Sequence, residues 1–117
     1  MKKIYYLSTC STCKSILSAL EIPSTFILND IKTKPLTEKD LEALKELSGS
    51  YEAVFSKRAQ LYKERDLRSK NLKEVDYKNL LLEHYTFLKR PIIIMDQALF
   101  IGNAKATIEA AKKRMHE

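Results

Sequence analysis

The apolar positions in the first 30 residues predict a strand, a helix and a second strand. The run KIYYL at Lys3–Leu7 is rich in β-branched and aromatic residues, which is typical of a buried strand. In the segment STCSTCKSILSALEI that follows, Ile16, Leu17 and Leu20 recur at helical spacing, and a proline ends the helix. The stretch STFILND at 24–30 predicts the second strand. A strand, a helix and a strand in this order indicate a βαβ unit with parallel strands.

The middle of the chain predicts helices rather than strands. In KPLTEKDLEALKELSG, Thr37 with Asp40 three residues later resembles a capping box, and Gly49 is a good helix stop. The apolar stripe of this helix consists of Leu41, Leu44 and Leu47. The highly charged segment 51–68 is predicted to be helical as well. Another helix is expected over 76–88, and its inward-facing residues are expected to be Tyr77, Leu80, Leu81, Tyr85 and Leu88.

The last part of the chain returns to a strand pattern. RPIIIMDQALFIGNA predicts two strands, 91–95 and 98–101, around a tight turn at Asp96–Gln97, which form an antiparallel hairpin. An amphipathic helix over Ala104–Met115 closes the chain. The order β-α-β, helices, β-β-α predicts an α/β fold with a four-stranded mixed sheet. We expect a single domain over 1–117 with a helical insert at about 36–88.

Composition and charge narrow the function classes. A chain of 117 residues suits one domain with a real core, and its longest apolar stretch, PIIIM, is far too short to cross a membrane. The apolar run near the N-terminus is also too short for a signal peptide, so we expect a cytoplasmic protein. The net charge of +6 fits either an acidic partner or a lysine-rich surface. Because acidic residues interleave the basic ones and no nucleic-acid motif is present, we favour the surface interpretation and expect no direct nucleic-acid partner.

The only two cysteines of the chain, Cys10 and Cys13, lie where the first strand gives way to the first helix. Unpaired N–H groups and the helix dipole at that place stabilise a thiolate, so the pKa of Cys10 is expected below the free value of about 8.5. Cys13 follows about one turn later on the same side, from where it can attack a disulfide formed at Cys10. Lys14 adds positive charge. A pair of thiols in a reducing compartment is better suited to chemistry than to a structural disulfide.

Anion binding is the second property expected of this loop. Thr9, Ser11 and Thr12, together with the local backbone N–H groups, are expected to cradle negative charge next to the helix N-terminus.

Two alternatives to redox chemistry stay open for the cysteine pair. A CxxC can form half of a zinc site, but tetrahedral zinc needs two more ligands, and the chain offers only His84 and His116, far apart and unaccompanied. The cysteines could also be incidental core residues, although they do not occupy the apolar stripe. A CxxC next to a βαβ pattern favours redox chemistry over both, and no metal is expected.

Four stretches of the sequence carry a family resemblance. They are YYLSTCSTCKSIL, DIKTKPLTEKDLEAL, AVFSKRAQLYKERDL and LLLEHYTFLKRPIIIMDQALFIGNA. Together with the order of elements, they resemble the arsenate reductase / Spx / YffB (ArsC-like) family of thioredoxin-fold proteins. The resemblance covers essentially the whole chain, and it implies a thioredoxin-like α/β fold with a helical insert.

The resemblance also implies roles for individual residues. Cys10 matches the nucleophilic cysteine of the family. Pro91 matches a proline whose peptide bond is cis and faces that cysteine. Arg90 matches an arginine that holds the oxyanion and lowers the thiol pKa in arsenate-reducing members, a role that suits a planar guanidinium. Without the resemblance, Arg90 would be interpreted as a surface charge at the end of a helix.

The sequence departs from the arsenate-reducing members at two positions. Ser56 stands where an arginine is expected, with Lys57 or Arg58 as substitutes one or two residues away, and Asn103 follows Gly102 where another arginine is expected. Bidentate oxyanion binding is thereby weakened, which argues against arsenate as the physiological substrate. The second cysteine instead matches the CxxC redox switch of the Spx-type regulators.

The resemblance leads to three functional hypotheses. The first is a thiol–disulfide oxidoreductase related to arsenate reductase that acts on a small-molecule thiol or an oxyanion. Cys13 or glutathione is its resolving thiol, no cofactor is bound, and glutathione, glutaredoxin or thioredoxin is the electron donor. The second is an Spx-type redox-sensing regulator that binds RNA polymerase, although this sequence ends at Glu117 without the longer C-terminal extension of those regulators. The third is a family member without arsenate chemistry that acts on another thiol.

Overall fold

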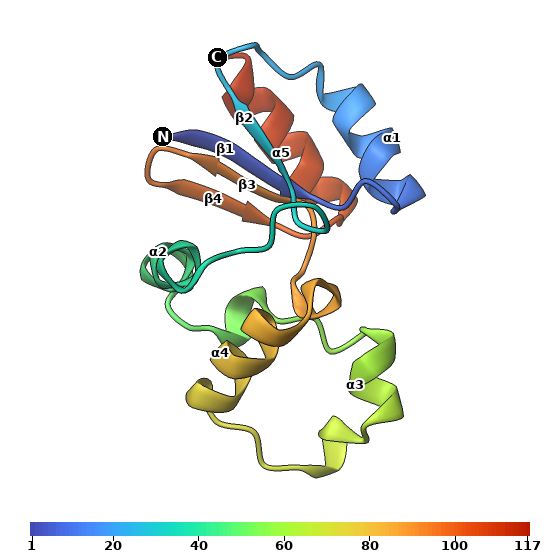
Figure 1. Cartoon of the computed structure of the whole chain (residues 1–117). Helices are drawn as coiled ribbons and strands as arrows, with labels where there is room; N and C mark the ends of the chain where they lie inside the picture. The colour runs from blue at the N-terminus through green and yellow to red at the C-terminus, as the bar shows by residue number, and fades with distance from the viewer. The chain divides into compact units, whose positions relative to one another are not determined.

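The computed structural model describes residues 1–117 and consists of two compact units (Figure 1). The first unit comprises Met1–Lys34 and Arg90–Glu117, and the second comprises Pro35–Lys89. The grouping of both units into one domain with an insert stays a prediction. No helix in the chain is both long and apolar enough to cross a lipid bilayer.

A four-stranded mixed sheet is the framework of the first unit. The strand order is β2-β1-β3-β4; β1 and β2 are parallel, whereas β3 is antiparallel to both β1 and β4. This arrangement confirms the predicted βαβ unit and the predicted hairpin. The elements are β1 (Lys2–Tyr6), α1 (Ser11–Leu20), β2 (Ile27–Asp30), β3 (Ile92–Met95), β4 (Ala98–Ile101) and α5 (Lys105–Met115).

Two elements of this unit are shorter than the sequence predicts. Strand β2 begins at Ile27 rather than at 24, because the N–H of Phe26 donates to the carbonyl of Pro23 in a turn (3.2 Å). Helix α1 ends at Leu20, where Glu21 adopts a left-handed conformation with φ of 54°. These turns let the chain reverse direction between α1 and β2.

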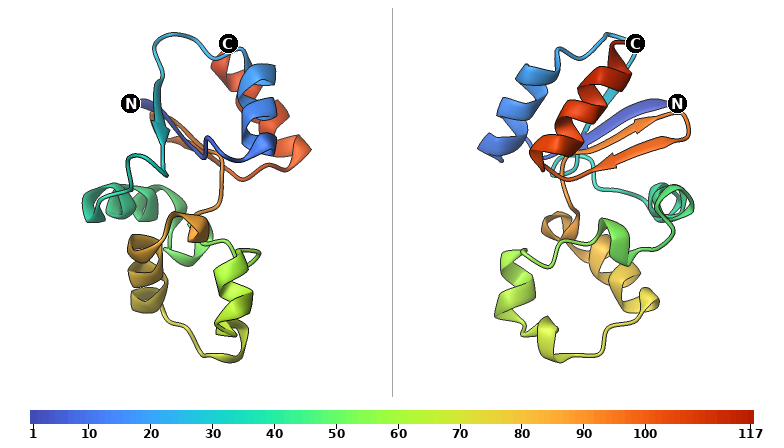
Figure 2. Two further views of the ribbon diagram at one scale, coloured as in Figure 1. Left: turned by 45° about the vertical axis from the view of Figure 1, so that its right-hand side comes forward. Right: turned by 180° about the vertical axis from the view of Figure 1, so that it is seen from behind.

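One face of the sheet packs against α1 and α5. Figure 2 shows that both helices lie on the same side of the sheet and begin at the same end of it. Alternate residues of a strand point to one face, which explains why Ile4, Ile93 and Met95 share this core with helix residues. The buried members of the cluster are Ile4, Leu20, Phe26, Ile93, Met95 and Ala111. The packing fixes where α1 begins relative to the strands.

The second unit is built from helices. Its elements are α2 (Glu38–Ser48), η1 (Glu52–Val54), α3 (Gln60–Glu64), η2 (Leu67–Ser69), α4 (Glu74–Glu83) and η3 (Tyr85–Phe87), where η marks a short 3-10 helix. The predicted capping box is present at the start of α2: the N–H of Asp40 donates to Thr37 Oγ1 (3.1 Å), and the N–H of Thr37 donates to Asp40 Oδ2 (2.9 Å). Gly49 ends α2 with φ of 97°, as predicted.

The helical prediction for 51–68 is confirmed only in part, because the segment is divided among the short helices η1, α3 and η2. Phe55 is extended (φ −90°, ψ 131°) and forms an isolated antiparallel bridge with Leu88, which ends η1. Asp66 adopts a left-handed conformation with φ of 49° and separates α3 from η2. Charge patterning alone does not reveal the interruption at Phe55, since it depends on a partner 33 residues away in the sequence.

The helix predicted over 76–88 is also interrupted. Helix α4 ends at Glu83, and an extended His84 (φ −150°, ψ 135°) leads into η3. Of the five residues expected to face inward, Tyr77, Leu81 and Leu88 are buried, whereas Leu80 and Tyr85 are half-buried. The fully buried Phe87 was not among them.

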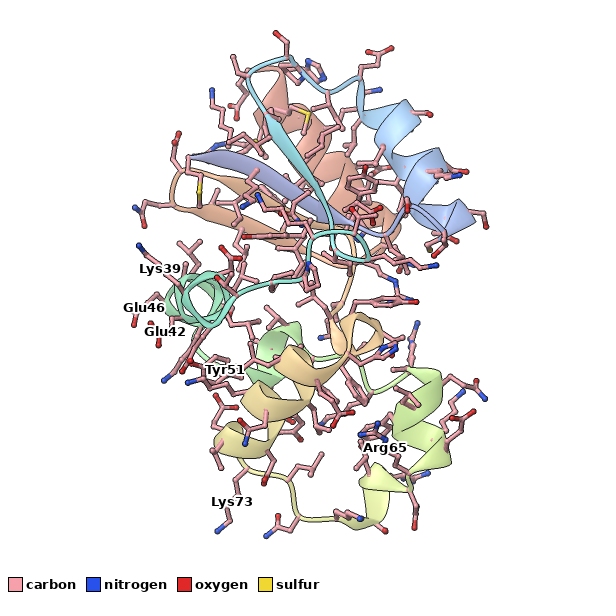
Figure 3. All side chains as sticks on the ribbon, viewed as in Figure 1. Lys39, Glu42, Glu46, Tyr51, Arg65 and Lys73 are labelled. Carbon is pink, nitrogen blue, oxygen red and sulfur yellow. The ribbon has the colours of Figure 1, made fainter.

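Removing the cap of α2 should destabilise the protein. We expect Thr37→Ala to lower the free energy of unfolding by about 1 kcal/mol, because it leaves the Asp40 N–H without its acceptor. Thr37→Ser keeps a hydroxyl at this position and should retain most of the free energy of unfolding. Lys39, which points into solvent (Figure 3), provides a control in the same turn, and Lys39→Ala should change stability by less than about 0.5 kcal/mol. Urea unfolding followed by circular dichroism measures all three variants, and equal losses for Thr37→Ala and Lys39→Ala would contradict the expectation.

Candidate active site

Cys10 lies at the junction between β1 and α1, as predicted. It is the N-cap residue of α1 (φ −95°, ψ 112°); its N–H donates to the carbonyl of Leu7 (3.1 Å), and its carbonyl accepts from the N–H of Lys14 (3.1 Å). Cys10 is partly exposed, whereas Cys13, one turn into the helix, is 1% exposed. Both cysteines are free thiols. The accessible sulfur is therefore the one that precedes the helix.

The pairing of the strands brings four segments to the same edge of the sheet. In the register, Tyr6 is opposite Asp30, and Ile92 is opposite both Tyr5 and Ile101. The chain therefore leaves β1, β2 and β4, and enters β3, at one edge. We call it the Cys10 edge, and it consists of residues 7–14, 30–34, 90–91 and 102–105.

The surroundings of Cys10 favour its ionised form. Burial opposes ionisation, but the backbone N–H of Cys13, the Cys13 thiol and Arg90 all stabilise the thiolate, so the pKa of Cys10 is lower than that of an ordinary thiol. Arg90 contributes through a hydrogen bond to the Cys10 side chain and through its charge. The Cys10 sulfur thus combines partial exposure with a lowered pKa, which is the environment of a reactive cysteine.

Cys13 has the opposite character. Burial raises the pKa of Cys13, and the negative charge of Cys10 and the hydrogen bond with its side chain raise it further. A backbone hydrogen bond from Leu7 and the charge of Arg90 offset only part of this effect. The outer sulfur therefore has the lower pKa of the two, and the inner thiol donates a hydrogen bond that stabilises the thiolate of the outer one.

The segment before β3 completes the site. The Arg90–Pro91 peptide bond is cis, as the resemblance implied, and the Pro91 side chain is buried. The carbonyl of Pro91 accepts a hydrogen bond from the N–H of Gly102 (2.9 Å), which joins this segment to the loop after β4. The arginine that interacts with Cys10 is thus held at a fixed connection between two strands of the sheet.

The remaining predicted site residues divide between the two units. Thr9, Ser11, Thr12 and Lys14 are exposed on the loop and the first turn of α1, which contains no acidic residue. Arg58 belongs to the second unit and is not among the residues that the sheet brings to Cys10.

The residues at the two departures from the family pattern also belong to different units. Lys57 belongs to the second unit, where its Nζ forms an ion pair with Glu52 Oε2 (2.6 Å). Asn103 is exposed on the Cys10 edge next to Gly102, whose φ of 90° is in the left-handed region. Arg90 is the arginine that the Cys10 edge contains.

Asp30 is a residue of the site that the sequence analysis missed. Its Oδ1 atom accepts the N–H of Ser8 (3.2 Å) and the N–H of Lys32 (3.2 Å). A hydrogen bond from the Ser8 side chain is the main reason that the pKa of Asp30 is lowered, and Thr33 contributes as well. Asp30 thereby connects the loop that carries Cys10 to the loop after β2. The sequence signal that could have identified Asp30 is its position at the end of a predicted strand that runs parallel to β1.

The contribution of Arg90 can be measured through the pH dependence of Cys10 alkylation. Because Arg90 lowers the pKa of Cys10, Arg90→Met should move the midpoint of the alkylation rate to higher pH, and Arg90→Lys should move it less far. Lys2→Met, which removes a charge from the other end of β1, serves as the control and should leave the midpoint in place. An unchanged midpoint in Arg90→Met would show that Arg90 does not act on the thiolate.

The sequence matches a known protein family over most of its length. A model of the ArsC family matches residues 5–111. The global transcriptional regulator Spx from Streptococcus pneumoniae (strain ATCC BAA-255 / R6) is 24% identical over 120 residues, which cover 99% of this chain and 89% of the regulator.

Solved structures show the same fold. A protein related to the ArsC family from Bacteroides fragilis superposes with a TM-score of 0.77 at 24% identity, covering 93% of this chain and 97% of the other. Arsenate reductase from Vibrio cholerae superposes with a TM-score of 0.74 at 19% identity, covering 95% of each chain. These likenesses confirm the predicted thioredoxin-like fold class.

Proposed function

Because the chain belongs to the ArsC family, we propose that it is a thiol–disulfide oxidoreductase whose nucleophile is Cys10. The observation that carries the proposal is the lowered pKa of a partly exposed thiol at the start of a helix, with a second thiol one turn away. The thiolate is the reactive form of cysteine, so a lowered pKa increases the reactive fraction near neutral pH.

The proposed reaction has two exchange steps. In the first, the Cys10 thiolate attacks one sulfur of a substrate disulfide, so that a Cys10–substrate disulfide forms and the other substrate sulfur leaves as a thiolate. In the second, Cys13 loses its proton and attacks the Cys10 sulfur. This step forms the Cys10–Cys13 disulfide and releases the second substrate thiolate. The substrate gains two electrons, and the cysteine pair loses two.

The structure suggests how the second step follows from the first. Before reaction, the negative charge of Cys10 and the hydrogen bond with its side chain raise the pKa of Cys13. Formation of the mixed disulfide removes the charge of Cys10, so the pKa of Cys13 falls at the moment when its thiolate is needed. Arg90 remains beside both sulfurs and stabilises the new thiolate. The resolving thiol is thus protected until the intermediate exists.

A thiol donor must return two electrons to the cysteine pair. Two molecules of glutathione, or the dithiol of a glutaredoxin or thioredoxin, can do so by the reverse of the same exchange steps. Arsenate is a poor candidate for the physiological substrate, because Ser56 and Asn103 stand where the family resemblance leads one to expect arginines of an oxyanion site.

A coupled assay tests the proposal. The wild-type protein should reduce a small disulfide such as hydroxyethyl disulfide when glutathione and glutaredoxin supply electrons, and it should show little turnover of arsenate under the same conditions. Disulfide reduction no faster than the background without protein would overturn the proposal. Arsenate turnover that exceeds disulfide turnover would reassign the substrate to an oxyanion.

The Spx relative favours a second candidate function. Its similarity extends over 99% of this chain, and it is a global transcriptional regulator. In this alternative, formation of the Cys10–Cys13 disulfide changes the surface around α1 and thereby alters binding to RNA polymerase. A pull-down with purified RNA polymerase, using reduced and oxidised protein, distinguishes the two: redox-dependent binding without disulfide turnover supports the regulator.

A further inference from the structure

Basic side chains gather on the segments around the nucleophile. The Cys10 edge carries Lys14 on the first turn of α1, Lys32 and Lys34 after β2, and Lys105 at the start of α5. All four lysines are exposed, and none of them forms an ion pair. Arg90 adds a fifth cation, directly beside the thiolate. The four lysines therefore present positive charge that no ion pair neutralises on the segments around the sulfur.

The only carboxylate at this edge is that of Asp30, and it is engaged in hydrogen bonds with the neighbouring loops. The Cys10 edge thus has a net charge of +4, from five cations and one carboxylate. The opposite edge is close to balanced, with a net charge of +1. Its basic residues are Lys2, Lys112, Lys113 and Arg114, and its acidic residues are Glu21, Asp96 and Glu117.

We infer that the disulfide reduced at Cys10 is carried by a protein with an acidic surface around its sulfur atoms. This inference rests on the proposed function and names the class of partner at the same site. Clustered charge of one sign attracts a partner of opposite sign and accelerates its association by roughly 10 to 1000 fold at low salt. The chemistry is the exchange described above, with the acidic protein as the disulfide substrate.

The width of the charged edge favours a protein over a small anion. The loop after β2 and the loop after β4 leave opposite margins of the sheet, three strand spacings apart. With spacings of about 4.8 Å, Lys32 and Lys105 are anchored about 14 Å from each other across the site. A tripeptide such as glutathione reaches about 10 Å when fully extended, which is less than the separation of the two backbone anchors. A folded partner can contact all five cations while its disulfide reaches Cys10.

A nucleic acid is the other acidic macromolecule that could lie along this edge. It offers no disulfide for Cys10 to attack, and the loops of the edge contain no aromatic side chain on which bases could stack. The reactive thiol at the centre of the charge therefore favours a protein.

Two charge-matched peptides provide the test. Each has a central cysteine that is linked to 2-thiopyridine through a disulfide, with either four aspartates or four lysines around it. Attack by Cys10 on the peptide sulfur releases 2-thiopyridine, and its absorbance gives the second-order rate constant. A neutral thiol, 2-mercaptoethanol, reacts with both peptides in parallel, so that intrinsic differences between the peptides can be divided out.

We expect the wild-type protein to react at least about ten times faster with the acidic peptide at low ionic strength. The preference should disappear at about 1 M salt, where charges are screened within about 3 Å. A variant with Lys14→Gln, Lys32→Gln, Lys34→Gln and Lys105→Gln should lose most of the preference while retaining Cys10, Cys13 and Arg90.

A matched control separates this effect from net charge. Replacing Lys2, Lys112, Lys113 and Arg114 with glutamine removes an equal number of positive charges from the opposite edge. The preference for the acidic peptide should persist in this variant. Equal rates with both peptides, or a loss of preference in the control alone, would overturn the inference while the proposed function stands. If neither peptide reacts faster than with 2-mercaptoethanol, the proposed function itself fails. Inhibition of both reactions by a short single-stranded DNA, without a preference for the acidic peptide, would assign the edge to nucleic acid instead.

Discussion

Replacing Cys10 with serine is expected to reduce disulfide exchange by at least about a thousandfold, to the background rate. A serine hydroxyl is not ionised near neutral pH and cannot form the mixed disulfide, so no covalent intermediate is available. The loss is measured as reduction of hydroxyethyl disulfide with glutathione and glutaredoxin, after subtraction of the rate that these two give without this protein.

Cys13→Ser is the matched control for this prediction. It keeps the nucleophile but removes the resolving thiol, so we expect release of one thiol per chain followed by accumulation of a mixed disulfide at Cys10. Mass spectrometry of the intact protein detects this intermediate by its added mass. Full turnover by Cys10→Ser, or a mixed disulfide that accumulates in Cys10→Ser but not in Cys13→Ser, would show that the roles have been assigned to the wrong sulfurs.

The largest effect on stability is expected at Phe55. Its ring is 1% exposed and contacts three other rings, with centroid distances of 4.8 Å to Tyr77, 5.3 Å to Phe87 and 5.9 Å to Tyr62. Phe55→Ala leaves a cavity among these rings, and we expect it to lower the free energy of unfolding by about 3–5 kcal/mol. Urea unfolding measures the loss, and Phe55→Leu, which retains most of the apolar volume, should lose less.

Phe55→Ala also separates stability from chemistry. Phe55 belongs to the second unit, whereas the residues that lower the pKa of Cys10 belong to the first. The folded variant should therefore keep the pH midpoint of Cys10 alkylation. A loss below about 1 kcal/mol would mean that the ring cluster is not the core of the second unit.

Local sequence patterns were sufficient for the strands, the hairpin and the cysteine pair. The apolar runs around Ile4 and Ile93, and the turn at Asp96, are signals within a few residues, and so is the CxxC at a strand-to-helix junction. The same holds for the capping box at Thr37.

Features that depend on contacts between residues far apart in the sequence could not be predicted from local patterns. Phe55 interrupts a charged, helix-like segment because it pairs with Leu88. Asp30 accepts a hydrogen bond from the N–H of Ser8 only because β2 pairs with β1. The interaction of Arg90 with Cys10 followed from family resemblance and not from the local pattern around Arg90, since 80 residues separate the two.

The alkylation rate of Cys10 as a function of pH tests the central claim most directly. Wild-type protein is treated with iodoacetamide over a range of pH, and mass spectrometry identifies the modified cysteine. Since the pKa of Cys10 is lowered, the rate should rise with a midpoint below the free-thiol value of about 8.5, and Cys13 should remain largely unmodified. A midpoint at or above that value, or faster modification of Cys13, would contradict an ionised outer sulfur held by the start of α1 and Arg90.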